Sequence, residues 1–214
     1  MPSRIASPPA LAVHEPIFEA YERVLGFVPE TLRTMARVPG LLESYAGLAV
    51  TVVGSGLISE ELAQLVANVT SSASGCRYCQ AHTIAHAEHL GTSPERLAEL
   101  WSFETSDRFD DAERAALRLA FHAGQHPNGV TDADVDACRH HFDDDQIAAI
   151  LAVCALFGFL NRWNDSLPTE LEPAPLASAG RYLAPQGWSA GKHAPSGLAT
   201  SAGSGTVDRS GGAS

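Results

Sequence analysis

Apolar residues recur along this chain at spacings of three and four, which is the period of an amphipathic helix. The pattern is clear over residues 40–54 and 58–74. It returns over residues 92–101, 110–125 and 131–142. No stretch shows the sustained strict alternation of a surface strand. The sequence therefore predicts an all-α fold of about seven or eight helices.

Several of these segments begin with residues that suit a helix start. Ser59 is a candidate N-cap before two acidic residues, and Ser93 precedes Pro94 at the first helical position. Asp110 or Asp111 opens a later segment in the same way. Acidic side chains in a first turn also favour the positive end of the helix dipole.

The segment 143–167 differs because its middle is apolar on nearly every face. A helix of this kind is expected to be the central, buried helix of the fold. Its longest uninterrupted apolar run, residues 147–160, is shorter than the roughly 20 residues that span a bilayer. We therefore expect no membrane association from it.

The two ends of the chain lack a periodic apolar pattern. Residues 1–14 are predicted to be a flexible segment, and residues 173–214, rich in Ala, Ser, Gly and Pro, a disordered tail. The predicted domain is then 15–172, large enough for one buried core.

Charge narrows the possible partners. The 214 residues carry a formal net charge of −11 and a single lysine, Lys192. Such a surface repels phosphate backbones and anionic membranes, so we expect neither nucleic acid nor membrane as a partner. The N-terminus has no basic-then-apolar signal, and the cytoplasm is the expected location.

A close cysteine pair carries the candidate chemistry. Gly75 ends one helical segment, and a new one begins near Cys76. At roughly 100° per residue, Cys79, His82 and His86 lie within about a third of the helix circumference from Cys76. The first-turn position favours thiolate through the helix dipole, His82 can take a proton, and His86 can pass it on. These residue types suit reduction of a peroxide to a sulfenic acid, followed by disulfide formation.

The cysteine pair has two other interpretations. Zinc is disfavoured because Cys76 and His86 are roughly 15 Å apart along one helix, so only a subset of the four ligand types could converge. The alternative that both cysteines are inert core residues is less favoured beside Gly75, an arginine and two histidines. Cys154 is expected to be a packing residue. Asn161 or Asn164 could face the thiols, although structural roles are favoured for both.

The block GCRYCQAHTIAHA, residues 75–87, resembles the CxxC helix of the alkyl hydroperoxidase D and carboxymuconolactone decarboxylase family, and more narrowly its peroxidase-related branch. Residues 155–172 resemble the last core helix of that branch. The resemblance covers roughly residues 15–172. It implies an all-α homo-oligomer that reduces peroxides without haem or metal and is recycled by a dithiol reductant. It assigns attack to Cys79 and resolution to Cys76.

The chain departs from the pattern of this family in its proton relay. Gln64 stands where the family has a glutamate, twelve residues before the first cysteine, and Glu60 and Glu61 are the candidates to replace that glutamate. The family histidine position holds Thr83, between His82 and His86. Two further hypotheses stay open: a redox or electrophile sensor with little turnover, and an enzyme acting on a lactone or keto acid that would not need the cysteines.

Overall fold

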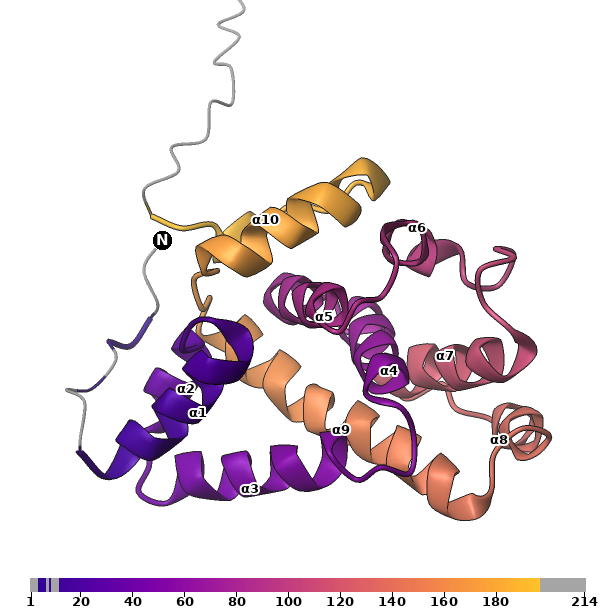
Figure 1. Ribbon diagram of the computed structural model, residues 1–214, viewed down its shortest axis with the longest axis horizontal. Coiled ribbons are helices and arrows are strands. Elements are labelled where there is room, and N and C mark those ends of the chain that lie inside the picture. Colours follow the sequence, from indigo (N-terminus) through magenta and orange to yellow (C-terminus); the bar gives the residue numbers. More distant parts are fainter. Residues whose placement is uncertain (1–3, 7, 9–11, 197–214) are drawn as a thin grey trace, which may run out of the picture.

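The computed structural model describes residues 4–6, 8 and 12–196, and within them it is entirely helical. The regular secondary structure of these residues consists of ten α-helices, labelled in Figure 1, and four 3-10 helices, which turns and loops connect. The α-helices are α1 (Glu15–Leu25), α2 (Glu30–Met35), α3 (Leu41–Val53), α4 (Glu60–Ala73), α5 (Arg77–His89), α6 (Pro94–Glu99), α7 (Asp111–Gly124), α8 (Asp132–Arg139), α9 (Asp144–Ser166) and α10 (Pro173–Tyr182). The predicted all-α fold is confirmed.

The centre of the fold is α4, which packs against α5, α7 and α9. Its unbroken run from Leu62 to Ser71 is buried on every side. Helix α7 approaches α4 closely because Gly124 has no side chain: a Cβ there would lie 2.5 Å from the Thr70 carbonyl oxygen. The position of α4 matters for function because the turn after it leads directly into α5.

Helix α9 is less buried than its composition predicts. It lies beneath α4 and α5 in Figure 1 and also contacts α3 and α7. Leu151 and Phe159 on its outer side are 37% and 41% exposed. By length and composition α9 would suffice to cross a membrane, but half of its apolar window is buried inside this fold. The expectation of a central, fully buried helix is therefore wrong for α9 and fits α4 instead.

The predicted helix starts are confirmed by their hydrogen bonds. The Ser59 hydroxyl accepts from the Leu62 N–H, and the Ser93 hydroxyl accepts from the Arg96 N–H. Asp110, rather than Asp111, caps α7 in a reciprocal capping box with Glu113. Side chains thus satisfy backbone donors that a helix start leaves without partners.

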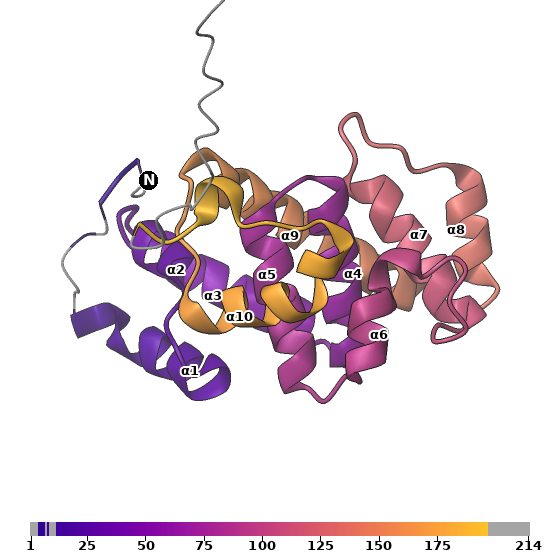
Figure 2. The ribbon, with the colours of Figure 1, turned by 90° about the horizontal axis from the view of Figure 1, so that it is seen from above.

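The prediction of a disordered tail from residue 173 is wrong for residues 173–196. Helix α10 lies across α5, as the view from above shows, and buries Ser178, Ala179 and Tyr182 (Figure 2). The small residues of α10 allow it to pack closely against α5. A composition that is typical of disorder therefore forms a helix contact in this segment. Residues 197–214 lie outside the described residues.

The N-terminal segment predicted to be flexible, 1–14, is described only in part. Arg4 donates from its backbone N–H to the Leu167 carbonyl and from its guanidinium to the Ser166 carbonyl, so it lies against the end of α9. Residues 12–14 form a short 3-10 helix that leads into α1. These described residues therefore have a defined place in the fold.

Candidate active site

Gly75 turns the chain between α4 and α5 and places the cysteine pair. Its φ of +78° is a left-handed conformation that residues with a side chain rarely adopt. Cys76 follows as the N-cap of α5, and its carbonyl accepts from the Gln80 N–H. Cys79 lies in the first turn of the same helix. The helix start predicted near Cys76 is confirmed.

Both cysteines are free thiols in the interior, with Cys76 fully buried and Cys79 2% exposed. Burial raises the pKa of the Cys79 thiol well above its usual range, and a hydrogen bond with Cys76 raises it further. Asn164 acts in the opposite direction. Burial thus opposes the thiolate that the position at the helix start was expected to favour.

Asn164 on α9 holds its amide against the sulfur of Cys79. The amide N–H groups point to the Cys79 sulfur at 3.6 Å and to the Leu160 carbonyl at 3.0 Å. The amide oxygen accepts from the Thr31 hydroxyl, which fixes its orientation. An N–H aimed at sulfur stabilises negative charge there once the proton has left. The hypothesis that Asn161 or Asn164 faces the thiols is thus confirmed for Asn164.

The carboxylate of the site comes from Glu172, just before α10, and not from position 64. One Glu172 oxygen lies 2.7 Å from Nε2 of His82. The other accepts from the Tyr78 hydroxyl at 2.9 Å and from the Glu30 N–H at 2.6 Å. Burial acts to raise the pKa of Glu172, but His82 and these hydrogen bonds outweigh it, and the net pKa is lowered.

The ring of His82 is held on two sides. The Tyr78 ring stacks on it with centroids 4.2 Å apart, and the Phe27 ring meets it edge-on at 5.6 Å. Together with Glu172, these contacts fix both the plane of the imidazole and the nitrogen that faces the carboxylate. His82 is thereby kept in one position at the wall of a cavity.

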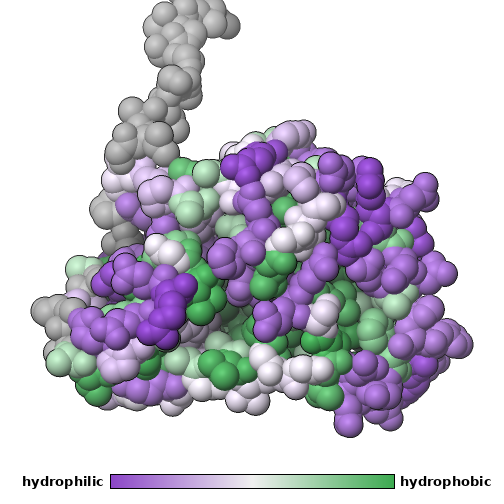
Figure 3. Space-filling model, viewed as in Figure 1, coloured by the Kyte–Doolittle hydropathy of each residue, from purple (hydrophilic) through white to green (hydrophobic). Residues whose placement is uncertain are grey.

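One cavity of about 630 Å³ brings most of the predicted site residues together. Cys79, His82, His86 and Gln64 all line it, whereas Cys76 does not. Its other walls are largely apolar side chains of α1, α3 and α9. Figure 3 shows a hollow with apolar surface on this face, beside the N-terminal helices.

Polar groups around the cavity are mostly neutral. Burial raises the pKa of Tyr45 well above its usual range and also raises that of Tyr21, so both remain phenols at neutral pH. Burial and the neighbouring histidines lower the pKa of His86. Gln64 is 3% exposed and supplies an amide where a relay carboxylate was expected. Glu60 lines the cavity, whereas Glu61 pairs with Arg96.

The four residues of the motif do not converge as zinc ligands. Within residues 12–196, no three of Cys76, Cys79, His82 and His86 place their ligand atoms within 4.8 Å of one another.

The site residues that the sequence analysis did not identify are Glu172 and Tyr78. Glu172 is 90 residues from His82, and no local spacing pattern connects them.

Comparisons with known proteins agree with this fold. The model of the carboxymuconolactone decarboxylase family matches residues 39–122. The crystal structure of the debrominase Bmp8 without ligand is 31% identical, with a TM-score of 0.78, over 84% of this chain and 98% of that one. A cysteine-to-alanine variant of Bmp8 in complex with 2,3,4-tribromopyrrole is 30% identical, with a TM-score of 0.79, over 84% and 99%.

A peroxidase-related protein from Ralstonia eutropha JMP134, with an alkylhydroperoxidase AhpD core, shares the fold at 22% identity and a TM-score of 0.73, over 81% of this chain and 94% of that one. No functionally curated protein matches the chain. The chain belongs to the carboxymuconolactone decarboxylase family, and its fold is that of the AhpD-like peroxidase-related proteins. The family resemblance drawn from the sequence is confirmed.

Proposed function

We propose that the protein is a thiol peroxidase that reduces organic hydroperoxides, with Cys79 attacking and Cys76 resolving. The observation that carries this proposal is the unequal placement of the two sulfurs. Cys79 faces the cavity, whereas Cys76 lies behind it, within hydrogen-bonding distance of the Cys79 thiol. Substrate in the cavity therefore meets Cys79 first, and Cys76 is placed to form the disulfide.

The first step transfers one oxygen atom to sulfur. Cys79–SH and ROOH give Cys79–SOH and ROH, as the O–O bond breaks and the thiol proton ends on the alcohol. The raised pKa of Cys79 means that a base must receive this proton as the sulfur attacks. His82 lines the same cavity and, held by Glu172, suits that role, while the Asn164 amide stabilises negative charge on the sulfur.

The second step forms the disulfide and ends the reduction. Cys76–SH and Cys79–SOH give the Cys76–Cys79 disulfide and water. An external dithiol then exchanges with this disulfide and restores both thiols. The cycle uses two electrons from the pair and needs no metal or organic cofactor.

The cavity favours an organic peroxide over hydrogen peroxide. A volume of about 630 Å³ with largely apolar walls accommodates a ring or a branched alkyl group. The Tyr21 and Tyr45 hydroxyls are hydrogen-bonded to each other, so one O–H of the pair and the amide of Gln64 can donate to a polar end of the substrate. Cumene hydroperoxide is a suitable probe.

The proposal predicts distinct effects of three cysteine substitutions on dithiothreitol-dependent consumption of cumene hydroperoxide. Cys79→Ser abolishes consumption. Cys76→Ser permits one turnover and leaves a sulfenic acid that dimedone traps, visible by intact mass. Cys138→Ser, a buried cysteine on α8, serves as the control and retains activity. Undiminished turnover by Cys79→Ser would refute the proposal.

A second candidate is reductive dehalogenation of a halogenated aromatic, favoured by the similarity to the debrominase Bmp8. The same two thiols would supply the electrons: the ring exchanges bromine for hydrogen, bromide and a proton leave, and the disulfide forms. Bromide release from 2,3,4-tribromopyrrole, lost in Cys79→Ser, with no consumption of hydroperoxide, would select this reaction instead.

The same variants separate the remaining hypotheses. A redox sensor forms the disulfide reversibly with negligible turnover, and brisk peroxide consumption excludes it. An enzyme acting on a lactone or keto acid keeps its activity when both cysteines are replaced. Loss of all activity in the double variant excludes that class.

A further inference from the structure

Cys76 has its own polar surroundings, on the side away from the cavity. Its sulfur, a carboxylate oxygen of Asp165 and a ring nitrogen of His193 all lie within 4.8 Å of one another. His193 belongs to the segment that follows α10, here called the C-terminal strap and defined as residues 184–196. The family match over residues 39–122 includes neither Asp165 nor His193.

The hydrogen bonds of His193 define its tautomer. Its Nδ1 lies 2.7 Å from the carbonyl oxygen of Thr169. A carbonyl only accepts, so Nδ1 carries the proton and Nε2 of the neutral ring presents a lone pair. Nε2 lies 3.5 Å from Asp165 and has no hydrogen-bond partner among the described residues, although His193 is fully buried. The nearest polar neighbours of this buried nitrogen are a carboxylate and a thiol, an arrangement that calls for an explanation.

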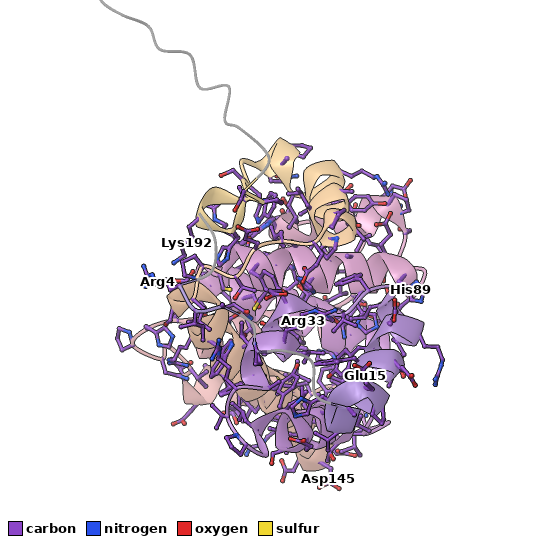
Figure 4. The ribbon with its side chains drawn as sticks, turned by 90° about the vertical axis from the view of Figure 1, so that its left-hand side faces the viewer. Arg4, Glu15, Arg33, His89, Asp145 and Lys192 are labelled. Carbon is purple, nitrogen blue, oxygen red and sulfur yellow. The ribbon has the colours of Figure 1, made fainter. Side chains whose placement is uncertain are left out.

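Backbone contacts hold the strap against the start of α5. The His193 carbonyl accepts from the Leu171 N–H at 2.9 Å. The Arg77 guanidinium, next to Cys76 in the chain, donates to the Ser189 carbonyl at 3.1 Å. Figure 4 shows Lys192 at one end of α5 and His89, which lines the cavity, at the other. The strap therefore lies at the end of α5 opposite to His89.

We propose that His193 is the base that takes the proton of Cys76 during disulfide formation, with Asp165 as the positioning residue. This inference rests on the proposed two-cysteine cycle. The Cys76 proton moves to Nε2 of His193, and the sulfur of Cys76 forms the bond to the sulfur of Cys79. The S–O bond of the sulfenic acid breaks, its hydroxide leaves on the cavity side and takes up a proton from water there to become water, and His193 releases the Cys76 proton to solvent, so that the protons balance.

The charges around His193 suit this role. Burial lowers the pKa of His193, which keeps the ring neutral and able to accept a proton at pH 7. The groups that face it are Asp165, Lys192, Cys76 and the Tyr78 ring, 5.9 Å away. Lys192 pairs with one oxygen of Asp165 at 2.8 Å and leaves the other oxygen toward His193, where it stabilises the imidazolium.

His193→Asn tests the proposal in a single turnover with cumene hydroperoxide. The Asn amide can still donate to the Thr169 carbonyl, but it offers no base. We expect disulfide formation to slow at least tenfold and the Cys79 sulfenic acid to accumulate as a dimedone adduct, while the first-step consumption of peroxide keeps its rate. His141→Asn, at an exposed histidine, is the matched control and behaves as the parent protein.

The pH profile separates a base from a packing residue. In the parent protein the rate of disulfide formation falls below a midpoint lower than the ordinary imidazole value of about 6.5. In His193→Asn the rate instead rises about tenfold per pH unit, because hydroxide must then remove the thiol proton. A slower rate with an unchanged profile, or no accumulation of sulfenic acid, overturns the proposal.

Two further measurements keep the test decisive. If circular dichroism shows that His193→Asn is unfolded, Asp165→Asn replaces it as the test variant. The midpoint of the pH profile of disulfide formation is then expected to move to lower pH, and an unmoved midpoint counts against the proposal.

Diamide oxidises Cys76 and Cys79 to a disulfide without peroxide. Slow diamide oxidation in His193→Asn together with no peroxide consumption by the parent protein would reject the peroxidase but keep the role of His193.

Discussion

Glu172 connects three parts of the fold through two oxygens. It contacts the His82 ring and the Tyr78 hydroxyl on α5, and the backbone N–H of Glu30 at the start of α2. Each contact is a charge-assisted hydrogen bond, which is stronger than a neutral one. A carboxylate in this position both orients His82 and stabilises it once it has accepted a proton.

Replacing Glu172 by Gln should therefore reduce peroxidase activity without removing the side chain's bulk. We expect kcat/KM for cumene hydroperoxide to fall by about 10²-fold, in the range typical of general base catalysis. Glu170→Gln, two residues earlier in the chain, is the matched control and should change kcat/KM less than twofold. Equal losses in both variants would assign the effect to the segment and not to the carboxylate.

The sequence predicts part of this site because part of it is local. Cys79, His82 and His86 lie in one helix, and their spacing indicates a common face, which the cavity confirms; Cys76, the N-cap of that helix, lies behind the cavity and not on that face. The partners of these residues are distant: Asn164 lies on α9, and Glu172 and His193 come later still. Gln64 lines the cavity, as the family pattern implies. Because Gln64 carries no charge, the sequence does not indicate which other residue supplies the carboxylate of the site.

At the scale of elements, the close packing of α4 and α7 requires a residue without a side chain at position 124. Gly124 lies where a Cβ would come within 3.0 Å of the Ala73 side chain and 2.5 Å of the Thr70 carbonyl oxygen. Both contacts involve atoms that cannot move without shifting a helix. Because α4 leads into Gly75 and Cys76, displacement of α4 also displaces the thiols.

We expect Gly124→Ala to lower the free energy of unfolding by about 1–3 kcal/mol, the usual cost of overpacking. Urea unfolding followed by circular dichroism measures this. Gly180→Ala on α10 is the control, since its Cβ would meet nothing within 4 Å. That substitution should stabilise the protein by about 0.5–1 kcal/mol, because alanine is the better helix former. A neutral or stabilising Gly124→Ala would contradict the packing argument.

Helix boundaries follow well from the sequence where caps are explicit, as at Ser59, Ser93 and Asp110. They do not follow for α1, α2 and α10. Helix α2 has only six residues, and α10 is built from Ala, Pro and Ser. In these helices tertiary contacts replace the periodic pattern that sequence interpretation requires.

For the whole molecule, five buried or paired groups make the fold sensitive to acid. Burial lowers the pKa of His86 and His193. Burial acts to raise the pKa of Glu88, Asp134 and Glu172, but their hydrogen bonds and charged partners lower it overall. All five groups bind protons more readily in the unfolded chain, so the stability that they contribute is present above their unfolded pKa values and is lost as pH falls through the folded ones.

The Tm should therefore decrease as pH is lowered from 7 toward 4, first through the histidines and then through the carboxylates. The net charge of −11 would act in the opposite direction, because protonation relieves repulsion between acidic side chains. Differential scanning calorimetry at constant ionic strength distinguishes the two effects. A Tm that stays level or rises on acidification would show that surface repulsion outweighs these five groups.

Because residues after α9 contribute to the site, a shortened version of this protein must keep them. A fragment limited to the family match, residues 39–122, would keep Cys76 and Cys79. It would lose the Asn164 amide, the Glu172 carboxylate and the His193 imidazole that surround them. Cloning boundaries should be placed after His193, and any purification tag beyond them. A version ending at residue 172 would keep the motif, Asn164 and Glu172 but lose α10 and His193, and we expect its disulfide formation to be slower.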